Sequence, residues 1–112
     1  MNFASDNAAG VAPGILEALG RVNDGHMLGY GNDAVTGRLA DQFNRLFGRE
    51  VAVYLVTTGT AANALALAHV SPPWGGVLCY QDAHIVTSEA GAPEFFGGGL
   101  KLIELAGEAG KI

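Results

Sequence analysis

The strongest constraint on the fold is an apolar run that ends at a hydroxyl and glycine turn and continues as an alanine-rich stretch. Residues 51–56 (VAVYLV) are aliphatic or aromatic, which is typical of a strand buried on both faces of a parallel sheet. Residues 59–68 are apolar on nearly every side, so we expect a buried helix that approaches the sheet closely. The pattern predicts a strand, a turn and a helix as the central unit of an α/β fold.

The turn between them, Thr57-Thr58-Gly59-Thr60, is suited to bind a small anion. Glycine permits a tight backbone path, and a threonine can cap the helix. The first turn of a helix presents unpaired N–H groups at the positive end of the dipole, and these attract a phosphate. The sequence lacks the lysine of a P-loop and the three glycines of a dinucleotide fingerprint, so the phosphate would be a small terminal one. On its own, the turn is read more simply as a helix cap without a ligand.

The strand at 51–56, the helix that follows it and a second strand at 77–80 together predict a parallel βαβ crossover. Ser71-Pro72-Pro73 ends the helix because proline cannot continue it. Further predicted elements are strands at 77–80 and 101–105, with a short helix at 89–96 between them. Ligands of such sheets bind at the carboxyl ends of the strands. We therefore expect His84, which follows the second strand, at the same edge as the turn at 58–60.

Two helices are predicted in the first half of the chain. Pro13 fits the first position of a short helix that Gly20 ends, and 21–30 has the character of a loop. The second helix has Asp33 as its N-cap and Gly48 just past its end. Its apolar side chains follow one stripe, which indicates a helix that covers a sheet or a neighbouring subunit.

Charge and composition exclude several classes of partner. A net charge of −5 without a basic patch argues against nucleic acid and against an anionic membrane surface. The apolar runs are shorter than the ~20 residues of a membrane span, and no signal-peptide pattern occurs, so we expect a cytoplasmic protein. We identify no metal-binding motif. The single cysteine, Cys79, lies in an apolar run and is expected to be a small core residue.

Five short motifs follow one another along the chain. They are Ser5-Asp6-Asn7, Tyr30-Gly31-Asn32-Asp33, Thr58-Gly59-Thr60-Ala61-Ala62-Asn63, His84-Ile85 and Glu89-Ala90-Gly91-Ala92. In this order they resemble the amino-terminal part of the low-specificity threonine aldolases. The resemblance implies a pyridoxal-phosphate enzyme with a three-layer αβα fold of the aspartate-aminotransferase type and a mainly parallel sheet. It divides the chain into an amino-terminal arm, helix and loop at 1–34 and the incomplete start of the large domain at 35–112.

The resemblance assigns roles to four residues of the predicted α/β unit. Gly59 and Thr60 would bind the phosphate of pyridoxal phosphate, which agrees with the helix-terminus argument. His84 would stack on the pyridine ring and help to move a proton during cleavage. Glu89 would support that imidazole or hold an active-site water, although its position also fits an acid in the first turn of a helix, where the dipole favours it.

Two further roles fall in the first half of the chain. Ser5 would lie near the substrate carboxylate, and Tyr30 would reach the cofactor phosphate of a neighbouring subunit. This implies a homo-oligomer, a dimer or a tetramer. The activity implied is cleavage of threonine-type β-hydroxy amino acids to glycine and an aldehyde. Asn63 is interpreted as a structural residue.

A lysine that would hold the cofactor as a Schiff base is missing from these motifs. The lysines of the chain are Lys101, inside the last predicted strand, and Lys111, and neither matches the family position. We therefore expect this chain alone to be inactive and to be part of a longer lyase. Two alternatives stay open: another pyridoxal-phosphate lyase of the same fold that catalyses β-elimination, and a non-catalytic module that binds phosphate or serves as a scaffold.

Overall fold

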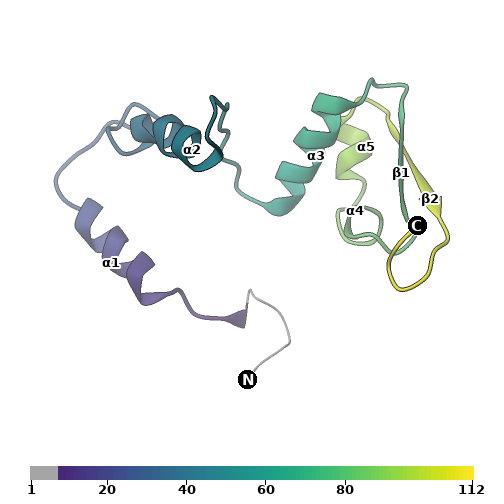
Figure 1. The fold of residues 1–112 in the computed structure, drawn as a ribbon, viewed down its shortest axis with the longest axis horizontal. Helices are drawn as coiled ribbons and strands as arrows, with labels where there is room; N and C mark the ends of the chain where they lie inside the picture. The colour runs from purple at the N-terminus through teal and green to yellow at the C-terminus, as the bar shows by residue number, and fades with distance from the viewer. Residues whose placement is uncertain (1–7) are drawn as a thin grey trace. The chain divides into compact units, whose positions relative to one another are not determined.

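The computed structural model describes residues 8–112, which form two compact units, 8–53 and 54–112 (Figure 1). The first unit contains α1 (Pro13–Val22), the 3-10 helix η2 (Thr36–Arg38) and α2 (Leu39–Phe47). The second contains α3 (Gly59–Val70), β1 (Gly76–Tyr80), α4 (His84–Thr87), α5 (Ala92–Phe96) and β2 (Lys101–Leu105). The predicted domains, 1–34 and 35–112, stay a prediction.

In the first unit, α1 begins and α2 ends at the predicted residues. Pro13 opens α1, but the helix continues past Gly20 to Val22, since a single glycine weakens a helix without ending it. Gly48 ends α2 with a φ of 65°, the left-handed conformation that glycine adopts most readily.

Asp33 caps a different turn from the one expected. Its Oδ1 accepts the N–H groups of Val35 and Thr36 at 2.9 and 2.8 Å, and its Oδ2 accepts the Thr36 hydroxyl at 2.6 Å. These bonds, the Thr36 hydroxyl foremost, lower the pKa of Asp33. They stabilise a tight turn that leads into η2, so the α-helix begins only at Leu39.

The strand predicted at 51–56 is wrong. Within residues 8–112 no strand pairs with this segment, and Tyr54 and Leu55 are 85% and 71% exposed. The N–H of Val51 instead donates to Oδ1 of Asn44 at 2.7 Å. A strand depends on hydrogen bonds to a neighbour, and an apolar pattern alone does not supply that neighbour.

The helix after this segment has the predicted ends. Thr58 is the N-cap of α3, and its hydroxyl accepts the N–H of Ala61 at 3.1 Å. The helix stops at Val70, just before Ser71 and the two prolines. Its burial is less than expected, because Ala64 is buried but Leu65 is 53% exposed. The helix packs against α5 in the second unit (Figure 1).

The predicted crossover from 51–56 to 77–80 is wrong, because 51–56 is not a strand among residues 8–112. The parallel pair is formed by the two later strands instead. β1 and β2 pair in parallel, from Gly76 opposite Lys101 to Tyr80 opposite Leu105, and α4 and α5 lie between them in the chain. Both strands are therefore confirmed, while the described sheet has two strands instead of the three expected. The small core of this unit consists of Ala64, Cys79, Pro93 and Leu100. Cys79 is buried as predicted, and burial raises the pKa of its thiol.

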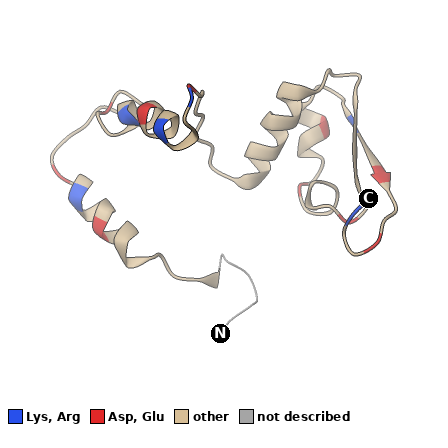
Figure 2. Cartoon of the chain, viewed as in Figure 1, with Lys and Arg blue, Asp and Glu red and all other residues tan. Residues whose placement is uncertain are grey.

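Charged residues of both signs lie along the helical stretch from η2 to α2. The acidic Asp41 stands in the sequence between the basic Arg38, the last residue of η2, and Arg45, and Figure 2 shows a red segment between two blue ones there. Of the helices in residues 8–112, none has the length and the apolar character to cross a membrane.

Gly97 lies where no side chain fits, and this gives a test of the packing. A Cβ there would clash with Cδ2 of Leu100 and lie 2.7 Å from the carbonyl oxygen of Pro93. We expect Gly97→Ala to lower the free energy of unfolding by ~1–3 kcal/mol, measured by urea unfolding followed by circular dichroism. Gly59→Ala is the control, because a Cβ at Gly59 meets no atom within 4 Å. Equal stabilities of the two variants would contradict this packing.

Candidate active site

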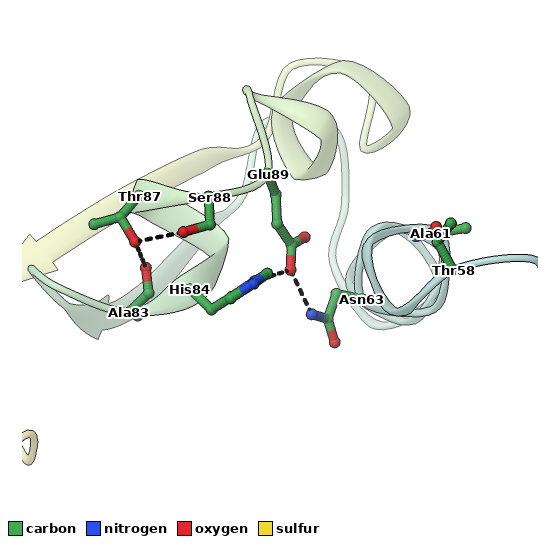
Figure 3. A network of polar contacts seen from close by, with 8 residues as sticks. All are labelled: Thr58, Ala61, Asn63, Ala83, His84, Thr87, Ser88 and Glu89. Carbon is green, nitrogen blue, oxygen red and sulfur yellow. Dashed lines mark hydrogen bonds and ion pairs between the residues drawn. The ribbon is translucent and has the colours of Figure 1, made fainter. Parts of the chain in front are cut away.

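The candidate site is centred on the carboxylate of Glu89, which lies between α4 and α5. Its Oε1 accepts the side-chain amide of Asn63 at 2.6 Å and lies 2.8 Å from Nδ1 of His84 (Figure 3). Glu89 is only 3% exposed, whereas 70% of the His84 side chain is accessible. A buried carboxylate thus holds an exposed imidazole from one side.

Three segments of the second unit bring these groups together. Asn63 comes from α3, and His84 is the first residue of α4. Glu89 follows α4 and precedes two residues with left-handed backbone, Ala90 at φ 51° and Gly91 at φ 76°. The alternative position of Glu89 inside the first turn of a helix is wrong, because α5 begins at Ala92.

The hydrogen bonds determine the protonation of the pair. The amide of Asn63 is the main cause that lowers the pKa of Glu89 below its ordinary 4.5, His84 adds to this, and burial acts against it. Glu89 is therefore ionised near neutral pH and can only accept hydrogen bonds. A neutral His84 then carries its proton on Nδ1, which leaves the lone pair on Nε2. The pair can thus supply a proton acceptor on an exposed ring.

The second oxygen of Glu89 is different from the first. Its Oε2 is buried and has no hydrogen-bond partner among residues 8–112. A buried acceptor without a donor costs free energy, and exceptions of this kind need a physical reason. The two contacts of Oε1 therefore hold the carboxylate in place, while the burial of Oε2 without a donor costs free energy.

The amino end of α3 offers two free donors. The N–H of Ala61 is taken by the Thr58 hydroxyl, and that of Ala62 by the Thr58 carbonyl oxygen. Within residues 8–112, no acceptor contacts the N–H groups of Gly59 or Thr60. α3 has 12 residues, so its dipole adds positive potential at this end. The arrangement can accept a phosphate group.

The other predicted site residues lie elsewhere in the chain. Tyr30 belongs to the first unit, where its side chain is fully exposed and its φ of 61° is left-handed. Ser5 lies outside the described residues. Asn63 is the residue whose contact sequence reasoning missed. The available signal was one amide side chain among the otherwise apolar residues 61–68, which does not indicate its partner.

The lowered pKa of Glu89 predicts how stability depends on pH. The unfolded chain takes up a proton at Glu89 at a higher pH than the folded chain does. The stabilisation is therefore present above pH 4.5 and is lost as the pH falls through the folded pKa. Glu89→Gln removes this titration, so the stability advantage of the native chain over the variant should shrink on acidification.

Urea unfolding at a series of pH values measures this difference. Other acidic groups, such as Asp33 with its own lowered pKa, are common to both proteins and cancel in the comparison. A difference that stays constant through the acidic range would show that Glu89 does not titrate as described.

Known proteins resemble this chain over nearly its whole length. Low-specificity L-threonine aldolases from a Pseudomonas species and from Pseudomonas aeruginosa are each 44% identical over 110 residues, or 98% of this chain and 32% of the relative. The chain spans about a third of the length of these relatives.

A solved structure of threonine aldolase from Leishmania major matches with a TM-score of 0.79 and 31% identity. The match covers 94% of this chain and 30% of that one. It confirms the predicted α/β fold, and the two Pseudomonas relatives confirm the resemblance to threonine aldolases. The family model described as beta-eliminating lyase matches residues 2–112. The chain therefore belongs to the beta-eliminating lyase family.

Proposed function

We propose that this chain carries part of the active site of a pyridoxal-phosphate lyase that cleaves threonine-type β-hydroxy amino acids to glycine and an aldehyde. The observation that supports it best is the buried Glu89 carboxylate, which joins the exposed His84 imidazole to α3 through Asn63. Asn63 lies three residues beyond Thr60, or about 4.5 Å along the helix axis. A ring-binding imidazole and a phosphate-binding helix end are thus linked by one helix.

The residues present fit the cofactor. The free N–H groups of Gly59 and Thr60 suit a dianionic phosphate at the positive end of α3, and the Thr60 hydroxyl adds a third donor. An exposed imidazole offers a flat face to an aromatic ring. When bound, pyridoxal phosphate supplies an electron sink for the bond between the α and β carbons of the substrate.

His84 and Glu89 would act on the proton of the β-hydroxyl group. Nε2 of a neutral His84 can accept that proton, which turns the imidazole into a cation. The Glu89 carboxylate, 2.8 Å from Nδ1, stabilises this cation and keeps the ring from rotating. In this proposal His84 is a catalytic residue and Glu89 supports it.

Other parts of the function rest on residues outside this pair. Lys101 lies in β2 and Lys111 lies near the end of the given sequence, and neither matches the position of the family's lysine, so we propose that neither holds the cofactor and that the chain alone is inactive. Ser5 near the substrate carboxylate and Tyr30 at the phosphate of a neighbouring subunit remain proposals. A homo-oligomer in the cytoplasm, without nucleic-acid or membrane partners, is proposed on the same basis.

A different lyase reaction is the second candidate. The matched family is described by β-elimination, which releases a substituent from the β carbon and does not break the bond between the α and β carbons. The products separate the two reactions, because only aldol cleavage of L-threonine yields glycine and acetaldehyde.

Replacing His84 tests the catalytic assignment. In the protein expressed from its gene, we expect His84→Asn to lower kcat for threonine cleavage by about 100-fold or more, the range of general acid–base catalysis. The absorbance of bound pyridoxal phosphate should persist, because its phosphate is held by other residues. Unchanged cleavage, or production of ammonia and a keto acid in place of glycine by the native protein, would refute the assignment.

Replacing Thr60 tests the phosphate site. Thr60→Val removes one hydroxyl donor to a charged group, so we expect pyridoxal phosphate to bind roughly 10- to 100-fold more weakly in an equilibrium titration. Thr57→Val is the matched control, since Thr57 lies in the same turn, one residue before the cap. Equal affinities for the two variants would place the phosphate elsewhere.

A further inference from the structure

Glu89 is held entirely through one of its two oxygens. Oε1 receives both contacts, the amide of Asn63 at 2.6 Å and Nδ1 of His84 at 2.8 Å, while Oε2 has no partner among the described residues. The Asn63 contact spans 26 residues of sequence, and the His84 contact spans 5. The carboxylate is thus fixed from α3 on one side and from α4 on the other (Figure 3).

We propose that Asn63 is a positioning residue that acts through Glu89 to keep the His84 ring in the tautomer with its proton on Nδ1. The significance for catalysis rests on the proposed function, in which the lone pair on Nε2 accepts the substrate proton. Asn63 itself touches neither substrate nor cofactor in this proposal.

The chemistry of the three groups leads to this role. The Asn63 amide donates a hydrogen bond and has no proton to transfer, so it favours the ionised form of the carboxylate. An ionised Glu89 accepts from Nδ1–H, whereas a protonated one would donate to Nδ1 and leave the imidazole proton on Nε2. Without the Asn63 amide, the buried carboxylate keeps one donor, and it either takes up a proton or turns toward water.

A purely structural role predicts a different result. If Asn63 only fastened α3 to the segment before α5, its loss would lower stability while the imidazole of the folded molecules kept its tautomer. Stability alone therefore cannot decide, and the state of the His84 ring must be observed directly.

The tautomer of His84 is measured in the 15N-labelled 112-residue chain by long-range 1H–15N correlation spectra, without cofactor or substrate. In the native chain with a neutral His84 ring, we expect the Nδ1–H form. In Asn63→Ala and in the isosteric Asn63→Asp, the ratio of Nδ1–H to Nε2–H should fall by severalfold or more. Asn63→Gln, which keeps the amide, should restore part of it.

Asn44→Ala is the matched control, because Asn44 also makes a side-chain hydrogen bond, at 2.7 Å to Val51, but lies in the other unit. It should leave the His84 spectrum unchanged. Folded Asn63 variants that retain the Nδ1–H form overturn the proposal. Loss of folding in all three Asn63 variants overturns it too, since Asn63 would then be structural.

The tautomer readout separates this proposal from the proposed function. A native protein without lyase activity, whose His84 tautomer nevertheless depends on Asn63, would refute the lyase assignment and support the positioning role. In an active protein, Asn63→Ala should lower kcat by about 10-fold or more with little change in KM, because a ring in the wrong tautomer impairs proton transfer and not substrate binding.

Discussion

The second unit depends on how one buried carboxylate is satisfied. Glu89 would be expensive to bury alone, and the Asn63 amide makes the buried ionised form tolerable. The same contact ties α3 to the segment that carries the imidazole, so packing and chemistry share one interaction. His84 is exposed and would be a mobile surface side chain without this partner. The contacts that offset the cost of burying the Glu89 carboxylate are therefore the same contacts that build the candidate site.

Local signals predicted much of the fold. Thr58 caps α3, Gly48 ends α2, and both later strands lie where their apolar runs indicated, because caps, breakers and short strands depend on nearby residues. The failure at 51–56 has the opposite cause. Strand formation there needs a neighbouring chain segment, and no local pattern reports whether residues 8–112 provide one.

The site was accessible to sequence reasoning only in part. Physical chemistry alone indicated an anion site at Gly59 and Thr60 and placed His84 at the sheet edge, while the roles of Glu89 and Tyr30 came from the family resemblance. Neither physical chemistry nor the family resemblance predicted the contact of Asn63 with Glu89. A hydrogen bond across 26 residues is a product of tertiary packing, and an amide in a helix is equally consistent with a side chain that faces water.

The turn at Ala90 and Gly91 limits how this region can evolve. Both residues have positive φ, which glycine adopts without strain, alanine at some cost, and β-branched residues hardly at all. Most substitutions at position 90 would therefore strain the backbone, whatever the chemistry of the new side chain. The conformation of the main chain thus limits which residues can stand beside Glu89, even at position 90, which is exposed.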